Sequence, residues 1–201
     1  KQLPKTDLNL KERLEKDGWI KIKEPKNLPL AILFSYPFIL ILCGVVILIG
    51  YYLEPELFGA FTGDTISFSI SLDIMTAAFI VVTFLYTILH ELIHGAFIPN
   101  VLSSSKTFWG FNGIFGFIYT QEPMKKGRFI VVSCMPFIVL SLVALPVSYL
   151  LGLLNGYTFL LFLINAGGSC VDFLNIVLIF FQVKRNRSII NNGFETYYSP
   201  E

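Results

Sequence analysis

Four long apolar runs constrain the fold of this chain more than any other feature of its sequence. They cover residues 30–53, 74–98, 129–151 and 157–181. Each run is long enough for a helix of roughly 35 Å, whereas the hydrocarbon core of a bilayer is about 30 Å thick. Lipid offers the backbone no hydrogen-bond partners, so a segment that crosses it must bond internally as a helix. We therefore predict an all-α polytopic membrane protein with four transmembrane helices.

Composition and charge agree with this class and predict its orientation. Only 14% of the residues are charged, compared with about a quarter in a soluble domain. Eight of the 15 lysines and arginines precede the first run, and the other seven lie between the second and third runs or after the fourth. The segment between the first two runs carries Glu54, Glu56 and Asp64 but no basic residue. Because cytoplasmic loops are enriched in lysine and arginine, we predict a multi-pass protein of a cell membrane with both termini cytoplasmic.

Outside the runs, the sequence predicts smaller elements at the membrane surface. Residues 1–29 are a cytoplasmic lead-in, residues 30–183 the four-span domain and residues 184–201 a cytoplasmic tail. The lead-in carries a leucine pattern typical of a short amphipathic helix ending at Gly18, and the alternation in WIKIKE that follows predicts a strand. Between the second and third runs, KTFWGFNGIFGFIY at 106–119 places Asn-Gly between two aromatic stretches, which predicts a short interfacial β-hairpin.

Both histidines of the chain lie in one motif, HELIH, at residues 90–94 within the second run. On a helix, positions i and i+4 point the same way, so His90 and His94 can bind one metal ion, expected to be Zn²⁺. Glu91 is rotated by about 100° from His90 and is placed to take a proton from a metal-bound water. An ionisable residue near the bilayer centre costs about 2.5–3.5 kcal/mol, so three of them in one apolar run need a compensating partner.

A hydrolytic zinc site has three protein ligands and one open position, so a third ligand must come from elsewhere. Away from the ends of the runs, Glu91 and Asp172 are the only carboxylates, and His90 and Asp172 lie at similar depths in parallel helices. We therefore predict Asp172 as the third ligand. In the alternatives that the sequence leaves open, Asp172 accepts a hydrogen bond from a histidine N–H, or Glu195 or Glu122 folds back to the metal.

Asn165 lies on one polar stripe of the fourth run with Ser169 and Asp172, at spacings i, i+4 and i+7. Gly167 and Gly168 would allow this helix to approach a neighbour closely. We predict that Asn165 binds the substrate backbone or an oxyanion, with an interhelical hydrogen bond as the equally weighted alternative.

Four segments together resemble a known family. They are HELIHGAF (90–97), FWGFNGIFGFIY (108–119), NAGGSCVDFLN (165–175) and GFETYY (193–198). They are similar to a zincin peptidase family of small bacterial membrane proteins, and an HExxH span followed by an aspartate in a later span resembles the site-2 protease class of intramembrane zinc metallopeptidases. The resemblance implies zinc ligation by His90, His94 and Asp172, with Glu91 catalytic. It also implies a hairpin near the active site that pairs with an extended substrate, and a location in the bacterial plasma membrane.

Together these features predict a membrane-embedded zinc metallopeptidase that hydrolyses peptide bonds in or near the membrane and opens toward the cytoplasm. Its expected partners are a membrane protein or peptide as substrate and the lipid bilayer. Membrane topology explains the placement of the basic residues, so no nucleic-acid partner is expected. Phe115 and Phe117 of the hairpin are predicted to bind substrate together with Asn165. The alternatives are a non-catalytic zinc-binding scaffold (a pseudoprotease) and a zinc transporter. Glu91 favours an enzyme, because a structural zinc ion has no use for a general base.

Overall fold

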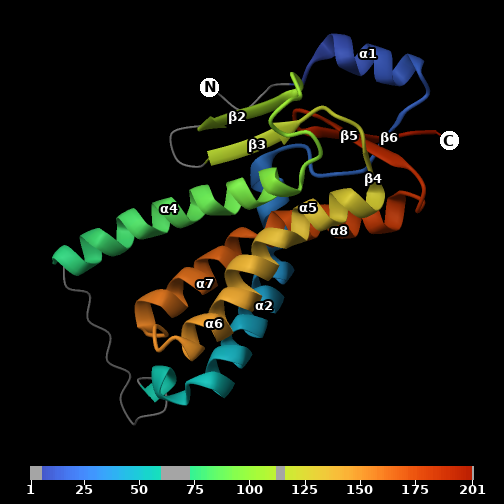
Figure 1. Cartoon of the computed structure of the whole chain (residues 1–201). Helices are drawn as coiled ribbons and strands as arrows, with labels where there is room; N and C mark the ends of the chain where they lie inside the picture. Colours follow the sequence, from blue (N-terminus) through green and yellow to red (C-terminus); the bar gives the residue numbers. More distant parts are fainter. Residues whose placement is uncertain (1–5, 60–72, 112–115, 201) are drawn as a thin grey trace.

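The computed structural model describes residues 6–59, 73–111 and 116–200. It contains four helical segments that are long and apolar enough to cross a membrane. They are Leu28–Leu53, Ile74–Phe97, Lys126–Leu150 and Gly156–Gln182. Each of them matches one of the apolar runs, so the chain is mostly helical with four candidate spans, as predicted (Figure 1).

The first two candidate spans are single helices, α2 (Leu28–Leu53) and α4 (Ile74–Phe97). Both begin at a side-chain cap, provided by Asn27 and Asp73, whose oxygens accept backbone N–H groups of the first turn. A short 3-10 turn, η1 (Pro55–Phe58), follows α2. These caps explain why each helix starts where its apolar run starts.

The outward face of α4 is apolar and open. Gly95 is the one buried residue of this helix, whereas Ile80, Val81 and Leu85 are 62%, 58% and 56% exposed. A soluble monomer rarely exposes a large apolar patch, and lipid would cover it. The exposed face therefore supports the assignment to a membrane.

The third and fourth candidate spans are broken helices. The segments of the third are α5 (Lys126–Phe137), a π-helical turn η2 (Ile138–Val143) and α6 (Ala144–Leu150), and those of the fourth are α7 (Gly156–Gly168) and α8 (Cys170–Gln182). Figure 1 shows α5 and α8 lying side by side, turned away from the direction of α6 and α7. Pro136 lacks the N–H that would continue α5, and two glycines precede the break of the fourth span at Ser169.

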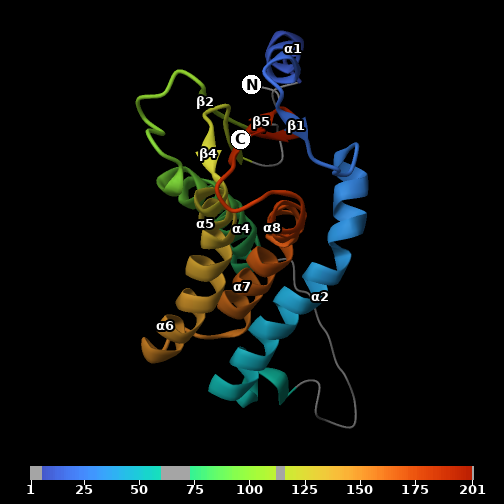
Figure 2. The same cartoon turned by 90° about the vertical axis from the view of Figure 1, so that its right-hand side faces the viewer.

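Helices α7 and α8 lie between α2 on one side and α5 with α6 on the other (Figure 2). Large apolar side chains fill this part of the bundle. The buried ones are Leu42, Val46, Phe137, Leu145, Phe159, Phe162 and Ala166. Helix α4 packs on α5 and α7.

A β-hairpin follows α4, as predicted. Its strands β2 (Thr107–Phe111) and β3 (Gly116–Thr120) are antiparallel neighbours. The predicted turn at Asn112-Gly113 and the predicted substrate residue Phe115 lie outside the described residues. The hairpin packs against α4 through β3, beside the end of the HExxH helix.

A second sheet corrects the expectation of an all-α fold with a single hairpin. Its four antiparallel strands have the order β1 (Ile20–Lys21), β6 (Glu195–Tyr198), β5 (Ser188–Asn192) and β4 (Met124–Lys125). Strands β5 and β6 turn at Gly193, whose φ of +64° suits glycine. Asn192 pairs with Glu195, so the loop between them is Gly193-Phe194, with glycine at its first position. Strand β1 lies within WIKIKE at 19–24, where the sequence predicts a strand, whereas the two-residue strand β4 is too short to leave a pattern.

The lead-in and the tail pack together as one cap on the bundle. Helix α1 (Leu8–Lys16) confirms the predicted amphipathic helix, and its Leu14 is buried against Tyr197. The side chain of Asn192 bonds both backbone groups of Asp7, at 2.8 and 2.9 Å. Because β1 also pairs with β6, the segments near the two chain ends lie on the same side of the candidate spans (Figure 1).

Candidate metal centre

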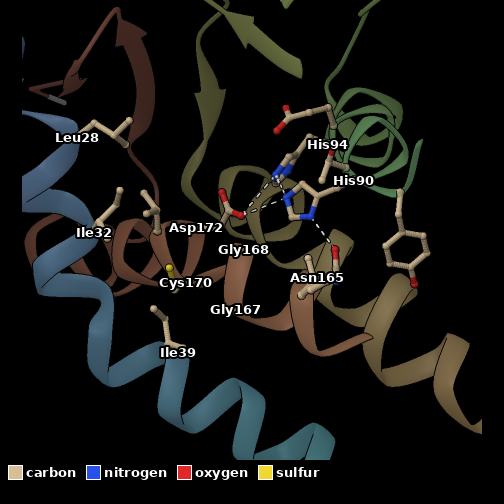
Figure 3. Close-up of a pocket in the computed structure, with 15 residues that line it drawn as sticks. Leu28, Ile32, Ile39, His90, His94, Asn165, Gly167, Gly168, Cys170 and Asp172 are labelled. Carbon is tan, nitrogen blue, oxygen red and sulfur yellow. Dashed lines mark hydrogen bonds and ion pairs between the residues drawn. The ribbon is translucent and has the colours of Figure 1, made fainter. Parts of the chain in front are cut away.

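The three predicted metal ligands meet where α4 and α8 approach each other (Figure 3). His90 and His94 lie one turn apart near the end of α4, with their Nε2 atoms 3.1 Å apart. Asp172 lies in the first turn of α8, and its Oδ2 is 3.5 Å from each Nε2. Within the described ranges, these three residues form the one group of side chains able to hold a metal ion.

Asp172 lies three residues after Ser169, where the fourth span is broken. The hydroxyl of Ser169 donates to the backbone oxygen of Asn165 at 2.9 Å at the end of α7. Figure 3 shows Asp172 pointing from α8 toward His90 and His94. The sequence-based comparison of depths treated the fourth span as one straight helix. It therefore predicted that Asp172 reaches the histidines but did not predict the break before it.

The spacing of the three ligand atoms fits zinc. Bonds from zinc to nitrogen and oxygen are about 2.0–2.1 Å long, so two ligand atoms of a tetrahedral ion lie about 3.3–3.4 Å apart. The separations in the structure are 3.1, 3.5 and 3.5 Å. Three ligands at this spacing would leave the fourth tetrahedral position for water or substrate.

Hydrogen bonds on the far side of each ring fix which nitrogen faces the cluster. His94 Nδ1 lies 2.8 Å from the backbone oxygen of Val132, and His90 Nδ1 lies 2.8 Å from Oδ1 of Asn165. Both acceptors require an N–H, so each neutral ring turns the lone pair of its Nε2 toward Asp172. Three electron-pair donors that face one point repel one another unless a cation lies between them. The donor set therefore fits a metal ion.

Glu91 stands outside the ligand set. Its Oε2 accepts the backbone N–H of Ile118 in β3 at 3.1 Å. Gly95 permits this close packing, because a Cβ there would lie 2.6 Å from Cδ1 of Ile118 and 3.2 Å from the ring of Trp109. The HExxH helix and the hairpin are thus in direct contact beside the predicted ligands.

Two cavities of different character adjoin the cluster. The larger, about 510 Å³, is bounded by α2, α4 and the junction of α7 with α8, and α2 contributes Leu28, Ile32 and Ile39 to its wall (Figure 3). The smaller, about 230 Å³, lies on the hairpin side, and its polar lining residues include Tyr119, Thr120, Ser133, Asn175 and Asn191. Three residues line both cavities: Glu91, His94 and Asp172. The cluster therefore faces an apolar space on one side and a polar space on the other.

The two glutamates considered as alternative third ligands have other partners. Glu195 in β6 lies 2.6 Å from the ammonium of Lys21 and 3.2 Å from that of Lys11. Burial acts to raise the pKa of Glu195, but hydrogen bonds from Lys21, Tyr197 and Lys11 outweigh it and lower the pKa to about 2. Glu122 accepts a serine hydroxyl at 2.7 Å. Neither glutamate belongs to the group of ligands described above.

The predicted substrate residues occupy different surroundings. Asn165 is only 5% exposed, and its amide bonds His90 and two groups of the third span. The ring of Phe117 lies against Gly110 of the neighbouring strand. Substrate contacts by Asn165 and Phe117 stay a prediction.

The sequence analysis missed the part of the third span that contacts the histidines. Val132 supplies the acceptor for His94, while Pro136 and Ser141 bond the amide of Asn165. The sequence did contain a pattern that could have predicted the contact between Val132 and His94. A proline inside an apolar run leaves the carbonyl four positions earlier without its helical donor, and Val132 precedes Pro136 by that spacing.

Comparison with known proteins agrees with this chemistry. Residues 83–187 match a protein family described as "putative zincin peptidase". The match covers just over half of the chain and includes both histidines, Glu91, the hairpin and Asp172. No curated protein and no solved structure gives a significant match. The chain therefore belongs to the putative zincin peptidase family.

Proposed function

We propose that this chain is a membrane-embedded zinc metallopeptidase that cleaves peptide bonds in or near the bilayer, with its active site open to the cytoplasm. The observation that carries the proposal is the convergence of two oriented imidazoles and a carboxylate, with Glu91 adjacent but outside the ligand set. Family membership supports a zinc peptidase in general, and the four apolar candidate spans support a membrane location.

Proton transfer in this proposal belongs to Glu91. Zinc, when bound, supplies a Lewis acid that polarises a carbonyl and lowers the pKa of a water molecule toward 7. The carboxylate of Glu91 receives the proton of the attacking water and passes it to the nitrogen of the leaving amine. His90, His94 and Asp172 hold the metal and take no part in the proton transfer.

The edge of β3 that faces Glu91 is the proposed docking site for the substrate backbone. Ile118 stands opposite Trp109 in the hairpin, yet its N–H bonds Glu91 rather than β2. A helical substrate hides its carbonyls in its own hydrogen bonds, so cleavage requires an extended backbone. A peptide added as a strand would take the N–H of Ile118 and bring its carbonyl beside the ligands. The same pairing would release Glu91 for proton transfer.

The two cavities suit the two reactants. The larger one has an apolar wall from α2 and reaches the ligands, which suits a segment arriving from lipid. The smaller polar one lies on the hairpin side, the side on which the cap lies, and suits water. If the termini are cytoplasmic, as the charge distribution predicts, water reaches the site from the cytoplasm.

The substitution Glu91→Gln tests the enzyme proposal. We expect the variant to fold and to keep about one zinc per chain, because Glu91 is not a ligand. Its turnover of a co-expressed membrane peptide should fall by about 10²–10⁴-fold, the usual contribution of a general base. His90→Ala is the matched control and should lose the zinc itself.

Each alternative function predicts a different result. Unchanged turnover in Glu91→Gln would remove the enzyme interpretation. A parent protein that binds zinc but cleaves no peptide would favour the non-catalytic scaffold. Zinc flux into vesicles that His90→Ala abolishes would identify a transporter.

A further inference from the structure

The third span is broken opposite the two histidines. In an α-helix the carbonyl of Val132 would accept the N–H of residue 136, but Pro136 has none. That carbonyl accepts the Nδ1–H of His94 instead, at 2.8 Å. The proline that interrupts α5 therefore leaves a backbone acceptor for one of the predicted metal ligands.

His90 is held through a chain of hydrogen bonds whose direction is fixed at its far end. Ser141, which is fully buried in the π-helical turn η2, donates its hydroxyl to the backbone oxygen of Phe162 at 3.0 Å. Its oxygen can then only accept, and it accepts from Nδ2 of Asn165 at 2.8 Å. Nδ2 also donates to the backbone oxygen of Pro136 at 3.2 Å. Oδ1 of Asn165 is thereby turned toward His90.

The Val132 carbonyl and the Asn165 side chain act in the same way on the rings of His94 and His90. Each Nδ1 is matched to an acceptor that requires a proton there, so each Nε2 is left with its lone pair facing Asp172. The histidine tautomers are thus set by groups outside the metal site. A third hydrogen bond links α4 directly to the π-helical turn η2. The hydroxyl of Tyr86 in α4 donates to the backbone oxygen of Leu140 in η2 at 2.5 Å.

We propose that the broken segment Pro136–Ser141 is a positioning device that fixes both histidines in the tautomer and orientation for binding zinc. Pro136 acts by leaving the Val132 carbonyl to His94, and Ser141 acts by orienting Asn165 toward His90. Neither residue touches the metal. The proposal rests on the proposed zinc site and adds the reason for a π-helical turn and a proline inside this span.

A purely structural role makes a different prediction. If the network only satisfies buried polar groups, its loss lowers the stability of the zinc-free protein and leaves the zinc affinity unchanged. If it positions the histidines, its loss weakens zinc binding and alters the coordination geometry. Outer hydrogen bonds to metal-ligating histidines typically change metal affinity 10–100-fold.

The experiment compares Pro136→Ala and Ser141→Ala with two matched controls in the same span, Pro146→Ala and Ser148→Ala in α6. Pro136→Ala restores an N–H that competes for the Val132 carbonyl. Ser141→Ala removes the acceptor that orients Asn165. Zinc affinity of the full chain in detergent is measured by competition with a chromophoric chelator. The absorption spectrum of the cobalt-substituted protein reports the coordination geometry, and thermal unfolding without metal reports the fold.

We expect both network variants to bind zinc about 10–100-fold more weakly, with a changed cobalt spectrum, while the controls match the parent. Parent-like zinc affinity and cobalt spectra in both network variants would overturn the proposal, whatever their melting temperatures. A failure of the zinc site itself is seen separately. In that case the parent binds no zinc, or His90→Ala binds it as tightly as the parent does.

Discussion

Gly95 controls how closely the hairpin approaches the HExxH helix, so Gly95→Ala should separate them. A Cβ at this position would lie 2.6 Å from Cδ1 of Ile118, whereas carbon atoms in contact normally lie about 3.5–4.0 Å apart. The hairpin or the side chain must therefore move by about 1 Å. A displacement of that size from productive geometry costs about 10²-fold in rate, so we expect turnover to fall about 10–100-fold. Zinc content should stay at the parent level, because a Cβ at Gly95 would meet the hairpin side chains of Ile118 and Trp109.

The assay is turnover of a co-expressed membrane peptide, read together with the zinc content of the purified protein. Gly44→Ala in α2 is the matched control, because a Cβ there would meet no atom within 4 Å. Parent-like turnover in Gly95→Ala would refute the idea that cleavage requires the close packing of the hairpin against the HExxH helix. Loss of zinc in this variant would show that the hairpin supports the metal ligands instead.

Further predictions concern the third ligand, the hairpin, the orientation and the cap. Asp172→Ala should weaken zinc binding while Glu195→Ala should not, as measured by metal analysis after dialysis. Phe117→Pro should impair cleavage but keep zinc, because it removes an N–H of the hairpin. Tags at the two termini should be accessible to modifying reagents only from the cytoplasmic side. Burial raises the pKa of Glu24 from 4.5 to about 7, so the folded state binds a proton that the unfolded state releases, and stability should fall as the pH rises from 4.5 to about 7. Glu24→Gln should flatten that dependence in thermal unfolding.

The sequence predicted the parts of the fold that depend on local pattern. A run of more than twenty apolar residues has few options besides a helix, so all four candidate spans were found. The hairpin at 106–119 and the helix at Leu8–Lys16 were found because turn chemistry and helical periodicity are also local. The meeting of His90, His94 and Asp172 was predictable because ionisable groups are rare in apolar runs, which left few candidates.

The parts that could not be predicted depend on tertiary partners. Strand β4 contains only two residues and is seen as a strand through its pairing with β5. A strand was predicted in WIKIKE, but its pairing with β6 could not be read from the sequence. An apolar run gives the length of a span but not the direction of its backbone, so the break at Ser169 left no trace in hydropathy. The π-helical turn also has no reliable sequence pattern, because its stability depends on the side chains that reach its backbone.

The breaks in the third and fourth spans and the polar cluster depend on each other. An imidazole inside an apolar bundle needs an acceptor for its N–H, and the interior carbonyls of an unbroken helix already accept a backbone N–H. Pro136 leaves one such carbonyl, and the turn that follows it presents Ser141 to Asn165. Irregular backbone is tolerated at membrane depth only where protein or a cavity covers it. Here α4 and α7 cover it, and both contribute hydrogen bonds to it. A sequence that straightened the third span would therefore take away the acceptor that the Val132 carbonyl gives His94 and the contact by which Ser141 holds Asn165.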